Sequence, residues 1–499
     1  MTMLFRAFIR PAIALAALLT LTPLASAALK VPAVFSDHAV LQQREPIQIW
    51  GWADPGTTVT VTLADNSATR NIGSDGKWSV ILPARKAGGP YDLKIVSNKG
   101  EGLTIKDLLI GEVWVCSGQS NMEMGMTAID KAQEEIAAAN YPNIRLFLIP
   151  KKAAETPQTD VEASWKVCTP DAVKEGGWGG FSAAAYFFGR KLHKELNVPV
   201  GVIETAWGGT QAEPWTSPEG FKSEPRLAHI LQEWESNVSR DEKMRLNPQR
   251  PSVLYNAMIA PITRLKVRGA IWYQGESNVP KAWEYRITFP NMIKSWREAF
   301  GEKNLPFYFV QIAPFEYSTA FNKAFGVDDT ACAELWDSQF YTLKNVKHTG
   351  MVVISDVGDI KDIHPKNKQA VGDRLANWAL AETYRVFGIQ HSGPIYQNMK
   401  VKGGAIEVKF FEEGKGLTTR DGAAPTHFQI AGDDKQFHPA TVTITDTDVV
   451  TVHSDEVKKP VAVRFAWHET AVPNLMNKEG LPASPFRTDD WKLNSQPKD

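Results

Sequence analysis

The sequence contains little cysteine and no spaced motif typical of a metal site. Three cysteines, Cys116, Cys168 and Cys332, are too few for a disulfide scaffold in a chain of 499 residues, although an oxidising compartment would permit one bridge. The sequence has neither a Cys-x-x-Cys pair nor a His-Glu-x-x-His motif, so it gives no support for a protein-bound zinc ion. We expect no metal and no organic cofactor.

The sequence also has almost no excess of either sign of charge, because 55 Lys and Arg residues are balanced by 56 Asp and Glu residues. A nucleic-acid partner would need a basic excess to neutralise its phosphates, and the formal net charge of −1 provides none. Beyond the N-terminal region, no segment is apolar over the roughly 20 residues that a bilayer-spanning helix needs. We therefore expect a small-molecule or glycan substrate rather than nucleic acid, and no membrane anchor. No pattern sets an oligomeric state.

The N-terminal region has the pattern of a secretory signal. Arg6 and Arg10 form a basic start, the apolar run Pro11–Leu24 follows, and Ala25-Ser26-Ala27 offers the small side chains that a signal peptidase accepts. The run is too short to cross a bilayer. We predict a cleaved signal peptide over residues 1–27 and a secreted or periplasmic protein. The remaining chain is too long for one ordinary core, which suggests two or three domains.

Apolar residues alternate with polar ones near both ends of the remaining chain. In Thr58–Leu63, for example, valines and a leucine alternate with threonines, and Trp78–Leu82 and Tyr91–Val96 are further short strands. This predicts a small β-domain over residues 28–108. Alternation returns after Gly388 and predicts a second β-domain over residues 389–499. Its expected strands are Ala405–Phe411, Thr441–Thr445, Val449–Val452 and Val461–Trp467.

Between these regions, short apolar strands alternate with helical patterns, which is typical of a parallel α/β sheet. The expected domain covers residues 109–388. Its helices are expected from Phe181 to Leu196, over Asn291–Phe300 and over Asn367–Val386. Its expected strands are Gly111–Ser117, Val200–Thr205, Gly269–Tyr273, Phe307–Gln311 and Met351–Ser355.

Polar residues gather after several of these strands. Ligands of open parallel sheets bind outside the carboxyl ends of the strands, so the clusters should converge. Each alone is compatible with an ordinary turn or a surface histidine. The four clusters are Gly118–Met122, Trp207–Thr210, Trp272–Asn278 and Asp362–Pro365.

Together the clusters contain the parts that acyl transfer needs. Ser120 on a tight turn is a candidate nucleophile, and paired glycines can offer N–H groups to an oxyanion. His364 is a candidate general base with a carboxylate beside it. The surroundings of Ser120 are not Gly-x-Ser-x-Gly, so the nucleophile turn of the α/β-hydrolases does not fit.

At these residues the chain closely resembles the sialate O-acetylesterase family, a branch of the SGNH hydrolases related to carbohydrate acetylesterases. The resemblance implies an α/β fold with a flavodoxin-like, three-layer α/β/α esterase domain flanked by two small β-rich domains. It covers nearly the whole chain after the leader. Besides the four clusters, it includes Val34–Asp37, Leu41-Gln42, Tyr255-Asn256, Gly480–Pro482 and Pro485–Asp489.

The same resemblance implies roles for individual residues. Ser120 would be the nucleophile and His364 the base. The oxyanion hole would consist of the Ser120 N–H, a glycine N–H at Gly208 or Gly209, and an amide side chain. For that amide Gln274 is preferred because it lies nearest the strand end, with Asn278 as the alternative. Further residues of these clusters are expected to bind substrate: Gln119, Asn121, Trp207 and Glu276.

The acid of the triad departs from the SGNH pattern, which has an acid three residues before the histidine. That position is Lys361 here, and Asp362 is only two residues before His364. Asp362, Asp359 or Asp356 could orient the ring, or a backbone carbonyl could do so. We take Asp362 as the first choice.

Aromatic and cationic residues near the clusters are further candidates for substrate contact. Flat rings suit sugars, but such residues more often belong to a core. Arginine binds carboxylates such as that of a sialic acid in a bidentate manner, and the spacing favours none over the others. Cys116 lies in an apolar strand and is better explained as a core residue. The aromatic candidates are Trp207, Trp215, Trp272 and Tyr273, and the arginines are Arg190, Arg264, Arg286 and Arg297.

The sequence therefore predicts a serine esterase that hydrolyses O-acetyl groups from a sialic acid, 9-O-acetyl sialate, through an acetyl-enzyme. An acetylxylan esterase or another carbohydrate acetylesterase is the alternative with the same machinery. An alternative of another class is a non-catalytic carbohydrate-binding protein that keeps an inactive hydrolase core.

Overall fold

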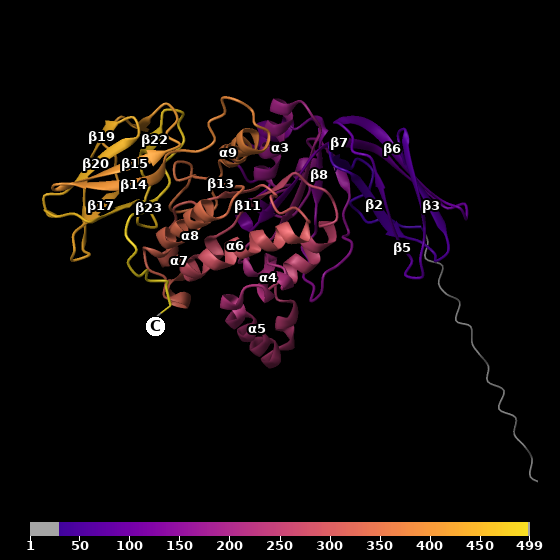
Figure 1. Cartoon of the computed structure of the whole chain (residues 1–499), viewed down its shortest axis with the longest axis horizontal. Coiled ribbons are helices and arrows are strands. Elements are labelled where there is room, and N and C mark those ends of the chain that lie inside the picture. The colour runs from indigo at the N-terminus through magenta and orange to yellow at the C-terminus, as the bar shows by residue number, and fades with distance from the viewer. Residues whose placement is uncertain (1–28, 498–499) are drawn as a thin grey trace, which may run out of the picture.

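The computed structural model describes residues 29–497, without the side chains of residues 322–325. The signal peptide predicted over residues 1–27 lies outside the described residues. The molecule is elongated, with an α/β region in the middle and smaller β-rich regions at its two ends (Figure 1). Within the described part of the chain, no helix is long and apolar enough to cross a membrane.

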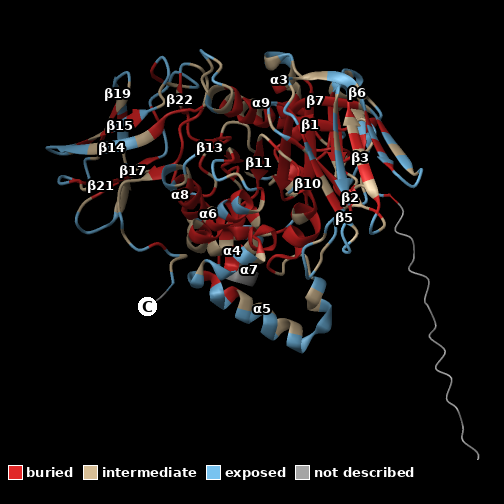
Figure 2. Ribbon diagram, turned by 45° about the vertical axis from the view of Figure 1, so that its right-hand side comes forward, coloured by how far each residue is buried: buried red, intermediate tan, exposed pale blue. Residues whose placement is uncertain are grey.

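The middle of the molecule contains a seven-stranded path through a larger mixed sheet, in the order β13-β12-β11-β7-β10-β8-β9. All neighbours along this path pair in parallel except β8 and β9. Figure 2 shows that the central strands are buried. The bounds are β7 (Gly102–Gly118), β8 (Tyr141–Leu148), β9 (Trp165–Cys168), β10 (Val200–Ala206), β11 (Gly269–Tyr273), β12 (Phe307–Val310) and β13 (Thr349–Val352).

The order of the strands explains where a ligand would bind. If the edge strands β8 and β9 are set aside, the remaining strands lie in the order β10-β7-β11-β12-β13. In chain order this is 2-1-3-4-5, the flavodoxin-type arrangement, whose ligand crevice lies outside the carboxyl ends of the strands where the order reverses. The reversal occurs at β7, so the crevice is expected beside the residues that follow β7.

Helices cover both faces of this sheet. Trp114 and Cys116 of β7 face a core shared with α3 and α9, whereas Val113 and Val115 face the other core, shared with α6 and α8. This alternation is what a strand buried on both faces requires. The helices are α1 (Ser120–Glu123), α2 (Ala132–Ala137), α3 (Ala183–Leu196), α4 (Pro218–Lys222), α5 (Ala228–Arg240), α6 (Ala282–Ala299), α7 (Tyr317–Phe325), α8 (Ala331–Asn345) and α9 (Lys368–Trp378).

The N-terminal β-rich region is joined to the middle region by a shared strand. The first part of β7 pairs with β6 and β1, and its last part pairs with β10 and β11. The domain boundary predicted after Leu108 therefore falls inside β7. The other strands are β1 (Val40–Gln42), β2 (Ile47–Trp52), β3 (Thr58–Leu63), β4 (Asn66–Asn71), β5 (Lys77–Leu82) and β6 (Gly88–Ser97).

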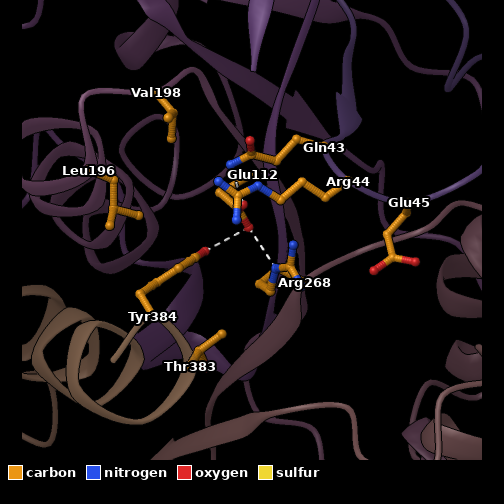
Figure 3. Close-up of a pocket in the computed structure, with 9 residues that line it drawn as sticks. All are labelled: Gln43, Arg44, Glu45, Glu112, Leu196, Val198, Arg268, Thr383 and Tyr384. Atoms are coloured by element: carbon orange, nitrogen blue, oxygen red, sulfur yellow. Dashed lines mark hydrogen bonds and ion pairs between the residues drawn. The ribbon is translucent and has the colours of Figure 1, made fainter. Parts of the chain in front are cut away.

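Glu112, at the middle of β7, adds polar contacts to this junction. Its buried carboxylate accepts hydrogen bonds from Gln43 Nε2 at 2.7 Å, Arg268 Nε at 2.8 Å and Tyr384 OH at 2.8 Å. These groups lie around a cavity of about 380 Å³ (Figure 3). Three donors from separate segments offset the cost of burying the charge. Glu112 lies six residues before the end of β7 at Gly118, about 20 Å along the strand, so the cavity is remote from Ser120.

The C-terminal region consists of small antiparallel sheets around a core of their own, which includes Val408, Ile430 and Phe465. Its strands are β14 (Ile395–Lys402), β15 (Ala405–Phe411), β16 (Leu417–Thr419), β17 (Phe428–Ala431), β18 (Phe437–Pro439), β19 (Thr441–Asp446), β20 (Val449–His453), β21 (Ala462–Phe465), β22 (Leu475–Asn477) and β23 (Phe486–Arg487).

The predicted α/β class with β-rich regions at both ends is confirmed at this level. In the middle region the sequence analysis missed β8, β9, α5, α7 and α8, and predicted α6 only over its second half. The three cysteines are buried and free, so the permitted bridge is not formed.

Candidate active site

Ser120 begins the one-turn helix α1 directly after β7. The strand ends at Gly118, whose φ of +146° favours glycine, and a Cβ there would lie 2.1 Å from the carbonyl oxygen of Tyr273. Gln119 is extended and forms the N-cap. The first N–H groups of a helix have no partner within it. Accordingly the Ser120 N–H has no hydrogen-bond partner among residues 29–497.

His364 lies on the loop between β13 and α9, and its Nε2 atom is 2.9 Å from Ser120 Oγ. The two residues are 244 positions apart in the sequence, and the fold brings them together as predicted. Burial lowers the pKa of His364, and the charge of Lys368 lowers it further, against the opposing effect of Asp362. The imidazole is therefore neutral at neutral pH and can accept the serine proton.

Of the three acids considered, Asp362 is the one beside the histidine. Its Oδ1 atom lies 3.8 Å from His364 Nδ1, too far for a hydrogen bond, and accepts the backbone N–H of His364 at 3.0 Å. Asp359 accepts the N–H of Lys361, and Asp356 forms a two-pronged ion pair with Arg374 at 2.6 and 2.7 Å. Asp362 therefore contacts the backbone of His364, and its effect on the ring is electrostatic: its charge raises the pKa of the imidazole.

The glycine loop after β10 lies against Ser120. A Cβ on Gly208 would be 3.3 Å from the Cβ of Ser120. The Gly208 N–H donates to Glu123 Oε2 at 2.7 Å, and the other oxygen of Glu123 pairs with Lys151 at 2.5 Å. The N–H group of Gly208 therefore already has a protein partner in this structure. The N–H of Gly209 has no partner within the described range.

The two amides predicted to face an oxyanion are buried and engaged elsewhere. Gln274 Nε2 donates to the carbonyl of Thr210 at 3.2 Å and to Asn278 Oδ1 at 2.6 Å. Asn278 Nδ2 donates to the buried carboxylate of Glu213 at 3.0 Å. Both donor groups are satisfied by protein, so neither amide is free to donate to an oxyanion in this structure.

The amide of Gln119 differs from these two, because only its oxygen has a protein partner. Its Oε1 atom accepts the backbone N–H groups of Gly275 at 3.4 Å and Ser277 at 3.2 Å. These contacts fix the orientation of the amide. Its Nε2 group has no hydrogen-bond partner within residues 29–497, and Gln119 directly precedes Ser120.

Asn121 and Glu276, predicted to bind substrate, are buried and bonded to each other instead. Asn121 Nδ2 donates to Glu276 Oε1 at 2.5 Å and to the carbonyl of Ile363 at 2.9 Å. Asn121 Oδ1 accepts from Lys368 Nζ at 2.5 Å. The sequence analysis missed Lys368, although it continues the buried face of α9 formed by Val371 and Leu375, three and seven residues later.

The aromatic candidates divide by burial. Trp215, Trp272 and Tyr273 belong to the core, whereas Trp207 is half-buried. Trp178, which the sequence did not single out, is 39 % exposed and meets the His364 ring edge to face at 4.6 Å. It lies in the glycine-rich segment 176–180, where no periodicity marks it.

None of the four arginines considered for a substrate carboxylate contacts the Ser120–His364 pair in the described chain. Arg190 pairs with Glu135 and Arg286 with Asp337. Arg264 lies over the ring of Trp50, and Arg297 donates to backbone carbonyls. Within residues 29–497 there is also no cluster of three or more His, Cys, Asp or Glu side chains suited to a metal ion.

Comparison with known proteins gives consistent results. A family model described as carbohydrate esterase, sialic acid-specific acetylesterase matches residues 110–380. The sialate O-acetylesterase of Homo sapiens is 30% identical over 498 residues, covering 91% of each chain. That of Mus musculus is 29% identical, covering 91% of this chain and 93% of its own. The crystal structure of a carbohydrate acetylesterase from Xanthomonas citri has a TM-score of 0.83 and 37% identity, covering 93% of this chain and all of that one.

Proposed function

The chain belongs to the sialic acid-specific acetylesterase family of carbohydrate esterases, and from this membership we propose that it removes O-acetyl groups from sialic acids by a serine mechanism. It is an ester hydrolase. The observation that carries the mechanism is the 2.9 Å contact between Ser120 Oγ and His364 Nε2 at the carboxyl end of β7.

In the proposed reaction Ser120 Oγ attacks the acetyl carbonyl while His364 Nε2 takes the hydroxyl proton. The tetrahedral intermediate collapses, the sugar oxygen takes that proton from His364, and the acetyl group stays on Ser120. A water molecule then attacks the acetyl-enzyme, giving its proton to His364. Collapse of the second intermediate returns the proton to Ser120 and releases acetate.

For the oxyanion we propose three donors: the N–H groups of Ser120 and Gly209 and the Nε2 group of Gln119. All three lack a protein partner in residues 29–497. Each such donor contributes about 10²–10³-fold to kcat in comparable sites. Glu123 holds the Gly208 N–H at 2.7 Å and so fixes the glycine loop beside the nucleophile.

The Asp362→Asn variant is expected to lose only about tenfold in kcat/KM, because the charge is 3.8 Å from Nδ1 and the carboxylate is 43% exposed to screening solvent. The asparagine keeps an oxygen for the His364 N–H. Because Asp362 raises the pKa of His364, its removal should move the acidic limb of the kcat/KM profile to lower pH. Steady-state kinetics across pH measure both effects. A loss near 10⁴-fold would instead mean that Asp362 bonds directly to Nδ1 during turnover.

Trp178 is proposed to form one wall of the sugar site, because its exposed ring lies against the base. Trp178→Ala should raise KM for an acetylated sugar by roughly tenfold through lost apolar contact, and change KM for a small aryl acetate much less. Phe387→Ala, which alters a fully exposed aromatic elsewhere, is the matched control. Equal changes for both substrates would contradict a sugar-binding role.

The sugar is tested by acetate release from 9-O-acetyl-N-acetylneuraminic acid and from acetylated xylan. We expect faster turnover of the sialate. A broader carbohydrate acetylesterase is the second candidate, which the likeness to the Xanthomonas citri enzyme favours. Preference for xylan would select it. A fluorophosphonate that fails to modify Ser120 would favour a carbohydrate-binding protein with an inactive core.

We further propose that residues 109–388 form an SGNH-type domain and that residues 28–108 and 389–499 are accessory β-domains. The 2-1-3-4-5 order supports the SGNH-type domain and the separate C-terminal core supports the second boundary, whereas β7 runs across the first boundary. Export to the periplasm or the exterior is proposed from the leader pattern of residues 1–27.

A further inference from the structure

Lys368 is a charged side chain with no exposure to solvent, located behind the proposed active site. Lysine is almost never fully buried unless it is paired. It is the first residue of α9, four positions after His364. Its Nζ atom donates to Asn121 Oδ1 at 2.5 Å and lies 4.9 Å from the centre of the Tyr273 ring. A buried ammonium in such a place requires an explanation beyond packing.

Asn121 connects this lysine to the base. Its amide group donates to Glu276 Oε1 at 2.5 Å and to the carbonyl of Ile363, the residue before His364, at 2.9 Å. An asparagine amide has two donors and one acceptor oxygen, and all are used here by three different segments. The other carboxylate oxygen of Glu276 is buried without a partner in the described chain.

We propose that Lys368 is a positioning residue of the esterase site. Its ammonium holds Asn121 of α1 against the loop that carries His364. Its charge also disfavours protonation of the imidazole, so that the base stays neutral at weakly acidic pH. The inference rests on the proposed serine mechanism. Lys368 forms no hydrogen bond with Ser120 or His364 within the described residues, so it acts through Asn121 and through its charge.

The titratable groups around Lys368 lie on several elements that pack against it. Glu276 follows β11, and Asp362 and His364 lie on the loop before α9. Both carboxylates favour the charged form of Lys368. Burial in turn raises the pKa of Glu276, against the lowering effect of its hydrogen bond from Asn121 and of the Lys368 charge. Burial outweighs them and lowers the pKa of Lys368 to about 7. Tyr273 on β11, Tyr317 on α7 and Cys332 on α8 have pKa values raised by burial, so they are neutral. Below about pH 7 the ammonium is therefore charged while His364 titrates.

The test is the pH dependence of kcat/KM for an aryl acetate in Lys368→Met. Methionine has a similar length and no charge, so the pKa of His364 should rise and the acidic limb should move to higher pH. The loss of activity should be larger at about pH 5.5 than at about pH 8. At the alkaline plateau kcat should fall by roughly tenfold with little change in KM, because Asn121 loses its anchor.

Two variants serve as controls. Lys366→Met removes an exposed charge from the same loop and should leave the limb in place. Asp362→Asn should move the limb in the opposite direction. A Lys368→Met limb that coincides with the wild-type limb would overturn the proposal, whatever the plateau rate.

If Lys368→Met does not fold, Glu276→Gln supplies the test. Glu276 favours the charged form of Lys368, so its loss should neutralise the lysine at lower pH and again move the acidic limb upward. An unmoved limb in that variant would overturn the inference. Reaction of Ser120 with a fluorophosphonate in every variant separates the two proposals. If Ser120 never reacts, the serine mechanism is refuted. If Ser120 reacts but the acidic limbs do not move, only the role of Lys368 is refuted.

Discussion

Ser120→Ala should lower kcat/KM for an acetyl ester by about 10⁴-fold or more and leave the fold intact. The Oγ atom bonds His364 Nε2 in this structure, so its removal deletes the attacking atom. The backbone turn is set by Gly118 and the N-cap at Gln119, neither of which needs the hydroxyl. Acetate release measures the loss of kcat/KM, and the thermal unfolding midpoint shows whether the fold is intact.

The matched control is Ser239→Ala on the exposed helix α5, whose hydroxyl bonds only within its own helix. It should react with a fluorophosphonate as the wild type does, whereas Ser120→Ala should not react. Turnover within tenfold of wild type in Ser120→Ala, after removal of any contaminating wild-type enzyme, would rule out the proposed nucleophile.

His364→Ala should cost about as much as Ser120→Ala, because the hydroxyl is a weak nucleophile unless a base takes its proton. The double variant should be no slower than either single variant, since residues that act as one unit are strongly non-additive. kcat of the three proteins on one aryl acetate measures this. Losses that multiply in the double variant would mean that the two residues act independently, contrary to their 2.9 Å contact.

Elements with simple alternation were predictable, and elements with mixed burial were not. β3 and β11 have the predicted bounds, because one alternates strictly and the other is apolar throughout. The strand β8 begins with Tyr-Pro-Asn, of which the Pro and Asn are exposed, and only its second half is buried. The sequence of the whole strand therefore shows neither alternation nor a continuous apolar run. In α8 every residue from 331 to 340 is buried, including Glu334 and Asp337, so no apolar stripe appears in the sequence.

The contact between Ser120 and His364 followed from the rule that strand ends converge. Which N–H groups are free did not follow, because that depends on partners far away in the sequence. Glu123 takes the Gly208 N–H, and Glu213 takes the Asn278 amide. Sequence spacing carries no information about such competition. The role of Asp362 likewise depends on a 3.8 Å separation that the number of intervening residues does not determine.

The strand that ends beside the nucleophile also forms part of the N-terminal sheet. Residues 102–111 of β7 are held by β6 and β1, and residues 112–118 by β10 and β11. The two sheets are therefore expected to open as one cooperative unit. A truncation between Leu108 and Leu109 would divide a continuous strand and remove the β1 partners of Ile110 and Gly111. The N-terminal region is thus not an interchangeable module but part of the frame that keeps Ser120 in place.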